Sequence, residues 1–214
     1  MGALKQNQTA IYYMTGTDLA RLEASPQLEG YRARGIEVLL LPDPVDSFWV
    51  TAGVDYEGKP FKSVTRGAAD LALIPLLEAE GKAGAEVSHA VARLMVAVKA
   101  TLSDQVSDVR ASERLTESAV CLVAPEGDMD RQLERVLVRS GQLGATAKPI
   151  LEINPRHELI VALAELGDDE KALREDASQL LFDEARILDG ELPVDVKAFS
   201  QWLTRVIKSY VSSR

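Results

Sequence analysis

The chain has 214 residues, 46% of them hydrophobic, and this length and composition suit one large globular domain or two small ones. Its net charge of -9 at pH 7 argues against nucleic acid or an anionic membrane as the main partner, because an acidic surface repels both. The start of the chain lacks the apolar run of a signal peptide, and no stretch of about 18 apolar residues predicts a membrane span.

The first part of the chain predicts a small α/β unit. A β-rich run, AIYYM at residues 10–14, precedes helical spacing at residues 17–35 that is interrupted at Pro26. The apolar run IEVLLLPDP at residues 36–44 then predicts a second strand. The order strand, helix, strand indicates a small parallel sheet, in which the nearly all-apolar second strand is expected to be buried on both faces.

A turn and a linker are predicted next. The segment GVDYEGKP, residues 53–60, has the glycine and lysine spacing of a phosphate-binding loop, but Pro60 stands where a serine or threonine hydroxyl is needed. Because proline offers neither a hydroxyl nor an N–H group, residues 55–61 are expected to form a turn between short extended pieces. Residues 65–84, which are rich in small residues and contain Pro75, are predicted to be a linker.

A second unit is predicted to begin with a long helix from Ala85 to about Ser103. Its apolar positions fall on one face, and they are Val87, Val91, Leu94, Val98 and Leu102. Three strand candidates follow, at residues 106–112, 119–125 and 148–155. The rest of the chain has helical spacing, in runs at residues 158–166, 171–190 and 194–211.

A short amphipathic helix is predicted between the second and third of these strands. In GDMDRQLERVLVRSG, residues 127–141, Asp128 is expected to cap the helix and Gly141 to end it. One face carries an apolar stripe of Met129, Leu133, Val136 and Leu137, and another carries Arg131, Arg135 and Arg139. A helix of about 13 residues is marginal in water, so this stripe is expected to be buried against something.

The last two helices carry apolar seams. In the final helix, Val196, Phe199, Leu203, Val206 and Tyr210 recur with the rhythm of helices that pack side by side. The preceding helix offers Leu173, Ala177, Leu180, Leu181, Ile187 and Leu188. The seams could pack within one chain or form a bundle shared by two chains. One seam of five side chains yields on the order of 10 kcal/mol, so a dimer would need both helices from both chains to offset an association cost of roughly 4 to 15 kcal/mol.

Residues with catalytic or metal-binding chemistry are sparse. The two histidines, His89 and His157, have no histidine or cysteine at metal-ligand spacing, and each is interpreted as structural. The acidic residues 168–170 suit a helix start, and Cys121, the only cysteine, is expected to be a packed thiol in a reducing cytoplasm. No catalytic constellation or metal site is predicted. The alternative hypothesis is a small cytosolic enzyme that binds a metabolite or nucleotide, with Lys59 as a contact.

Several segments, in order and spacing, resemble the bacterial members of the heat-shock protein 90 family of molecular chaperones. They are QTAIYYMTG, SPQLEGYRARGIEVLLLPDPVDSFWV, KSVTRG, VSDVRASERLTESAVCLVAPEGDMDRQLERVL and KPILEINPRHELI. The resemblance covers nearly the whole chain but only the back part of the family protein. The resemblance implies that the N-terminal ATP-binding domain and the larger front portion of the middle domain of the family protein have no counterpart in these 214 residues.

The resemblance implies an α+β fold with two domains. Residues 1–75 would be the small α/β subdomain that closes the middle domain, and residues 76–214 a C-terminal dimerisation domain with a helix, a small three-stranded sheet and a helical bundle. Family members form a homodimer through the last two helices of each protomer. The interface residues implied here are Leu180, Leu181, Ile187, Leu188, Phe199, Leu203, Val206 and Tyr210.

The resemblance also implies a surface that holds non-native client proteins. In the family, the helix that matches residues 128–140 is exposed, mobile and amphipathic, which makes Met129, Leu133, Val136 and Leu137 the implied client contacts. Phe48 and Trp49 match a second client-binding patch, although packing under the small sheet is an equal alternative for Trp49. Ser47 stands where the bacterial pattern usually has glutamate, and Leu133 where it usually has methionine.

The function implied is that of a cytoplasmic stress-response chaperone fragment that assists protein folding and binds unfolded proteins. ATP and magnesium would bind only the missing N-terminal domain, so this chain is expected to have no cofactor and no enzymatic activity. No nucleic acid or membrane partner is expected. A third hypothesis is a purely structural dimerisation module, in which helix 128–140 packs on its own chain.

Overall fold

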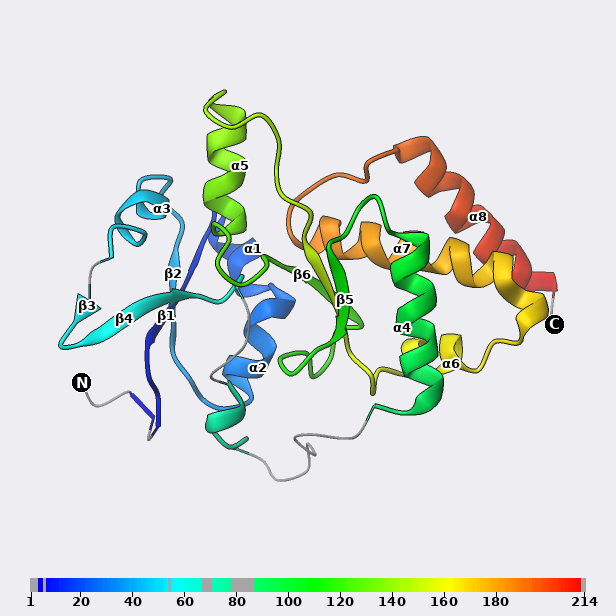
Figure 1. Cartoon of the computed structure of the whole chain (residues 1–214), viewed down its shortest axis with the longest axis horizontal. Coiled ribbons are helices and arrows are strands. Elements are labelled where there is room, and N and C mark those ends of the chain that lie inside the picture. The colour runs from blue at the N-terminus through cyan, green and yellow to red at the C-terminus, as the bar shows by residue number, and fades with distance from the viewer. Residues whose placement is uncertain (1–3, 6, 54, 67–70, 78–86, 213–214) are drawn as a thin grey trace. The chain divides into compact units, whose positions relative to one another are not determined.

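The computed structural model describes residues 4, 5, 7–53, 55–66, 71–77 and 87–212. The fold is α+β, as predicted, and the chain forms two compact units (Figure 1). The first comprises Met1–Ala85, Glu113–Thr116 and Val123–Lys148, and the second comprises Glu86–Ser112, Glu117–Leu122 and Pro149–Arg214.

A four-stranded sheet forms the centre of the first unit, with the order β2-β1-β4-β3. Its strands are β1 (Ile11–Thr15), β2 (Val38–Leu41), β3 (Asp55–Tyr56) and β4 (Lys59–Ser63). Strand β1 is parallel to both β2 and β4, which confirms the predicted parallel sheet, and β3 is antiparallel to β4.

Strand β2 is less buried than predicted. It lies at the edge of the sheet, where Val38 and Leu40 pack against the core. Leu39, which points to the other face, is 43% exposed. The expectation of burial on both faces was therefore wrong, because an all-apolar run does not reveal whether both faces of an edge strand are covered.

Short helices connect the first two strands. Helix α1 (Leu19–Glu23) is capped by Asp18, and the 3-10 helix η1 (Pro26–Leu28), capped by Ser25, leads into α2 (Glu29–Arg32). The break at Pro26 is thus confirmed, since proline is accepted in the first turn of a helix but not in its interior. Tyr12 of β1 and Tyr31 of α2 pack edge to face in the core, with ring centroids 4.9 Å apart.

Residues 71–77 pack on the first unit and are not a linker. Leu71 and Ile74 are buried in its core. The guanidinium of Arg34 donates Nε–H to the carbonyl oxygens of both residues, at 2.8 and 2.9 Å. The linker prediction was therefore wrong here, because apolar side chains among small residues can still be part of a core. The rest of the predicted linker beyond residue 66 lies outside the described residues.

A later segment, Glu113–Thr116, is part of the first unit. Arg114 is fully buried, and its guanidinium donates to the carbonyl oxygens of Val64 and Arg66. The backbone N–H of Thr116 donates to a carboxylate oxygen of Glu29. These hydrogen bonds join residues about 50 or more positions apart, so the unit includes segments that lie well beyond residue 75.

The second unit packs helices on a three-stranded sheet. The strands β5 (Asp108–Ala111), β6 (Val120–Val123) and β7 (Ile150–Ile153) have the order β5-β7-β6, with β5 parallel to β7. Helix α4 (His89–Thr101), capped by Ser88, begins later than predicted, and Ala85 lies outside the described residues. Its buried stripe is as predicted except for Val87, which precedes the helix and is exposed.

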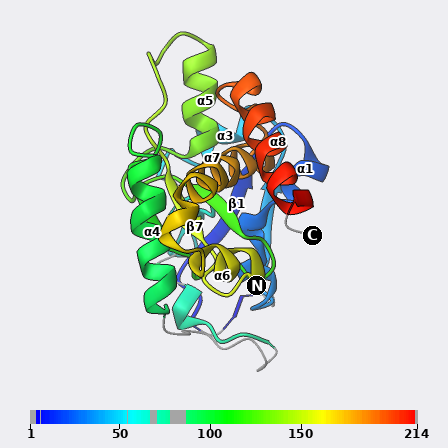
Figure 2. The same ribbon diagram turned by 90° about the vertical axis from the view of Figure 1, so that its right-hand side faces the viewer.

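The C-terminal part of the chain is helical, as predicted. It contains α6 (Glu158–Ala164), the 3-10 helix η3 (Asp168–Glu170), α7 (Lys171–Leu188) and α8 (Val196–Ser212). Helices α4 and α7 bury side chains in the same core as the sheet, and α8 runs along α7 (Figures 1 and 2). Cys121 of β6 is buried, as expected of a packed thiol.

Candidate functional site

The amphipathic helix predicted at residues 128–140 is helix α5 (Arg131–Arg139), and it belongs to the first unit. Its N-cap is Asp130, not Asp128, because the Asp130 carboxylate accepts hydrogen bonds from the N–H groups of Gln132 and Leu133 at 2.8 and 3.3 Å. Asp128 and Asp130 have the same capping chemistry, so the sequence did not distinguish between them. The predicted N-cap was therefore two residues too early.

The predicted end of α5 is confirmed. Gly141 has a φ of 73°, a left-handed conformation that glycine adopts without strain. Its N–H donates to the carbonyl of Val138, and the N–H of Gln142 donates to the carbonyl of Leu137. This pair of bonds is the Schellman motif that closes a helix.

The Asp130 carboxylate also fastens α5 to the sheet. Thr15 and Ser63 end the parallel strands β1 and β4, and Thr65 follows two residues later. All three hydroxyl groups donate to the carboxylate: Thr65 at 2.7 Å, Thr15 at 3.4 Å, and Ser63 through a short hydrogen bond. Asp130 itself is only 2% exposed. The negative charge of Asp130 also affects Tyr13. Burial of the Tyr13 hydroxyl, as the larger cause, and the charge of Asp130 together raise the pKa of Tyr13 to about 12.

The apolar stripe of α5 is divided between the core and the surface. Leu133 is 8% exposed and belongs to the buried first turn, whereas Met129, just before the helix, is 46% exposed. Val136 and Leu137 are half-buried. Figure 1 shows the C-terminal end of α5 pointing away from the four-stranded sheet. We refer to Met129, Val136 and Leu137 as the α5 surface.

The arginine face of α5 is divided in the same way. Arg131, in the first turn, is buried, Arg135 is half-buried, and Arg139, in the last turn, is exposed. Glu134 is buried as well, and its carboxylate accepts a hydrogen bond from the N–H of Ala147 at 2.5 Å. The first turn is therefore the docked part of the helix.

Helix α3 (Asp46–Trp49) contacts α5 within the first unit. Phe48 is 49% exposed and Trp49 is 38% exposed. Trp49 packs edge to face on Phe61, and its indole N–H donates to the Asp46 carboxylate at 2.7 Å. Trp49 is therefore partly packed and partly open, while Phe48 is the freer of the two. Ser47 is buried, so this position presents little of its side chain to solvent.

Helix α8 forms a second exposed apolar surface. None of its 17 residues is buried, and several of them are large and apolar. Its exposed large apolar side chains are Val196, Leu203, Ile207, Tyr210 and Val211, whereas Phe199, Trp202 and Val206 are half-buried. Sequence reasoning missed Ile207 and Val211, although a helical wheel places them beside Leu203 and Tyr210. We refer to the five exposed residues as the α8 surface.

Helix α7 presents large apolar side chains to solvent only near its end. Ile187 and Leu188 are exposed, and Leu192 and Val194 in the following connection are more exposed still. Leu180 is half-buried. Leu181 lies in the core of its own unit. A bidentate ion pair between Arg205 of α8 and Asp176 of α7, with N–O distances of 2.5 Å, aligns the two helices.

The segment with phosphate-loop spacing forms a β-hairpin turn, as expected. Glu57 and Gly58 both have positive φ angles and connect β3 to β4. The Lys59 ammonium donates to the backbone carbonyl of Gln8 at 2.7 Å. His157, interpreted as structural, caps α6 by accepting from the N–H of Leu159.

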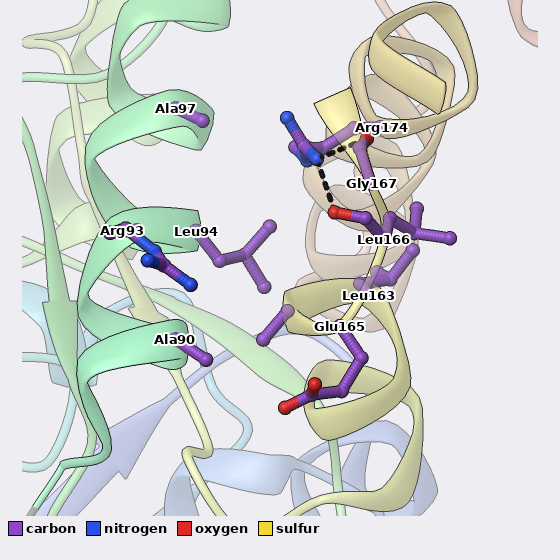
Figure 3. Close-up of a pocket in the computed structure, with 10 residues that line it drawn as sticks. Ala90, Arg93, Leu94, Ala97, Leu163, Glu165, Leu166, Gly167 and Arg174 are labelled. Carbon is purple, nitrogen blue, oxygen red and sulfur yellow. Dashed lines mark hydrogen bonds between the residues drawn. The ribbon is translucent and has the colours of Figure 1, made fainter. Parts of the chain in front are cut away.

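A pocket of about 490 Å³ lies in the second unit between α4, α6 and the start of α7 (Figure 3). Arg93 and Leu94 line it from α4, and Leu163 and Glu165 line it from α6 and its end. The guanidinium of Arg174 donates to the carbonyls of Leu166 and Gly167, at 2.7 and 2.9 Å, and so holds the connection between α6 and α7. The predicted sites do not include these residues.

Within the described part of the chain, no helix combines the length and the apolar character that crossing a bilayer requires.

A family model described as "Hsp90 protein" matches residues 1–214. The chain is 59% identical over 208 residues to the chaperone protein HtpG of Nitrobacter winogradskyi, which covers 97% of this chain and 33% of that protein. It is 62% identical over 206 residues to HtpG of Azorhizobium caulinodans, covering 96% and 32%. Against HtpG of Rhizobium meliloti the identity is 57% over 203 residues, covering 95% and 32%. The chain thus spans about a third of the length of these relatives.

Proposed function

The chain belongs to the Hsp90 protein family, and we propose that it is the dimerising, client-binding portion of an ATP-dependent molecular chaperone. It would hold non-native proteins on the α5 surface together with Phe48 and Trp49, and it would pair with a second copy through α7 and α8. The observation that carries the proposal is that the two amphipathic helices α5 and α8 both present apolar side chains to solvent.

The composition of the α5 surface supports client holding. Met129, Val136 and Leu137 are available beside the aromatic side chains of α3, and Arg139 is exposed at the end of the helix. Methionine and aromatic side chains adapt to many apolar partners, and a few such residues carry most of the energy of a binding surface. A surface of this kind suits weak binding of exposed apolar segments, because it demands no particular sequence from the client.

The energy available at the α8 surface supports dimerisation. Its five side chains are between 41% and 65% exposed in the single chain. Burying the exposed parts of five such side chains from each of two chains yields on the order of 10 kcal/mol. Association costs roughly 4 to 15 kcal/mol. The exposed residues Ile187, Leu188, Leu192 and Val194 add to the favourable term, so a bundle of α7 and α8 from both chains is the arrangement that we propose.

ATP and magnesium would bind outside these 214 residues, in the N-terminal domain that the family resemblance indicates, and this chain alone would not hydrolyse ATP. We propose a cytoplasmic location, which the single buried cysteine favours.

Aggregation of a model client tests the holding function. The double variant Met129→Asp, Leu137→Asp replaces two side chains of the α5 surface by charges, and it should suppress aggregation several-fold less well than the wild type. Leu133 is unsuitable for this test, because its burial means that a charge there would disturb the fold.

A matched control carries the same charge change elsewhere. The variant Val96→Asp, Leu159→Asp alters two exposed apolar residues of α4 and α6 and should suppress aggregation as the wild type does. Equal suppression by all three proteins would remove the α5 surface from the proposed function.

A further inference from the structure

We propose that Asp130 is the positioning residue of the client-holding surface, fixing α5 to the small α/β unit so that the α5 surface and Phe48 present one face. This inference rests on the proposed function. Asp130 touches no client itself and would act through the direction in which it holds α5.

The hydrogen bonds of the Asp130 carboxylate to both the helix and the strand ends support this role. Oδ1 accepts from the N–H groups of Gln132 and Leu133 in the first turn of α5, and also from the hydroxyl group of Thr15 at the end of β1. Oδ2 accepts from the hydroxyl groups of Ser63, the last residue of β4, and of Thr65, two residues later. One side chain therefore joins the N-terminus of the helix to the carboxyl ends of the strands. A carboxylate this deeply buried is stable only where such hydrogen bonds replace water, and the helix dipole adds to its stability.

The rest of α5 is less buried than its first turn. Beyond the buried first turn, Val136, Leu137 and Val138 are half-buried, and Arg139 is exposed. The anchor therefore sits at one end of the helix, where a small rotation displaces the far end most. Helix α3 belongs to the same unit and contacts α5, so an α5 held by Asp130 keeps the two parts of the surface in a constant relation.

Substitution by serine separates capping from anchoring. In Asp130→Ser the hydroxyl can still cap α5, since serine is a good N-cap, but the shorter side chain cannot also reach the strand hydroxyls. In Asp130→Asn the amide oxygen can cap the helix while the amide N–H₂ donates to Ser63 and Thr65, whose hydroxyls also accept hydrogen bonds. Asparagine should therefore preserve the position of α5, and serine should not.

The position of α5 can be measured directly. Spin labels at Thr51→Cys, beside α3, and Arg139→Cys, at the end of α5, occupy exposed sites, while Cys121 is buried. We expect one narrow distance distribution for the wild type and for Asp130→Asn, and a broad one for Asp130→Ser. Amide exchange in α5 should rise in Asp130→Ser while circular dichroism and the dimer mass stay unchanged.

Client affinity completes the test. If serine leaves α5 in the productive direction for about a tenth of the time, the dissociation constant for a labelled unfolded client rises about tenfold, because affinity falls with the competent fraction. Asp130→Asn should bind within about twofold of the wild type. A narrow distance distribution and unchanged affinity in Asp130→Ser would overturn the positioning role.

A different result would contradict the proposed function, independently of the role of Asp130. If the wild type and the Met129→Asp, Leu137→Asp variant bind the client equally, the surface itself is wrong, whatever Asp130 does to α5. A broad distance distribution in Asp130→Ser with unchanged client affinity would overturn the positioning role of Asp130. The α5 surface would still be the client-binding site if the Met129→Asp, Leu137→Asp variant lost affinity for the client. Thr65→Val checks the anchor from the strand side, and it should broaden the distribution in the same direction.

Discussion

Asp183 is a residue at which burial and ionisation conflict. It lies in α7 with only 3% of its surface exposed. Burial raises the pKa of its carboxyl group, and the charge of Asp195 raises it further, whereas Arg186 and the backbone N–H of Val194 lower it. The net pKa is above the ordinary value for aspartate. The ionised form at neutral pH therefore reduces the stability of the second unit.

We expect Asp183→Asn to change how stability depends on pH. Because the folded pKa is raised, the folded state binds the proton more tightly, and this stabilises the fold below the unfolded pKa of about 3.9. That contribution is lost as the pH rises through the folded pKa. Asparagine keeps an oxygen for the Val194 N–H, so its advantage over the wild type should grow across this window in denaturant unfolding at a series of pH values.

The exposed Asp104 offers a control in the same unit. Asp104→Asn removes a negative charge from an exposed position, and comparison with it separates the effect of burial from the loss of one charge. A profile for Asp183→Asn that runs parallel to the wild type would contradict the raised pKa.

Single residues also show where sequence reasoning stops. The apolar setting of Cys121 predicts its burial, since an apolar strand rarely leaves a small thiol exposed. The burial of Asp130 and Arg114 could not be predicted, because their partners lie 65 and 50 residues away in the chain. Hydrogen bonds between distant segments leave no periodic pattern in a sequence.

Elements with a strong period were the most predictable. The stripe of α4 and the three strands of the second unit follow from apolar spacing, and Pro26 and Gly141 mark breaks that backbone chemistry requires. The starts of α4 and α5 were less certain, since several residues near each start can cap a helix. Residues 71–77 were predicted to belong to a linker because their sequence shows no helical or strand period, although Leu71 and Ile74 are buried.

Helix α2 depends on a close approach that only glycine permits. A Cβ atom on Gly30 would lie 2.7 Å from the Cα of Arg114 and 2.8 Å from its carbonyl oxygen. Both are backbone atoms of a fully buried residue, so the segment at residues 113–116 would have to move. This contact links two elements of the first unit that are far apart in the chain.

We therefore expect Gly30→Ala to destabilise the protein. Alanine gains up to about 1 kcal/mol of helix propensity, whereas overpacking of this kind costs about 1 to 3 kcal/mol. Because the clash involves backbone, the upper part of that range should apply, leaving a net loss of about 2 kcal/mol in denaturant unfolding. Gly144→Ala is the control, since a Cβ there meets no atom within 4 Å. Equal stability of the two variants would show that the contact is not restrictive.

At the scale of the whole molecule, the rhythm of the last helix predicts a packing seam but not its partner. Helix α7 covers one side of α8, where Phe199 and Val206 are half-buried. The exposed side runs through Val196, Leu203 and Ile207. A sequence shows both stripes as one broad apolar face, so the packing within the chain is needed to separate the side already used from the side left for a second copy.

The exposed side predicts the effect of charge on assembly. Leu203→Asp with Ile207→Asp would bury two carboxylates in the proposed bundle, at a cost of several kcal/mol each. Since the bundle yields on the order of 10 kcal/mol, this variant should be a monomer by light scattering at concentrations where the wild type is a dimer. Val96→Asp, which places one charge on a residue of α4 that is 71% exposed, should remain a dimer. A double variant with the mass of a dimer would place the interface on another surface.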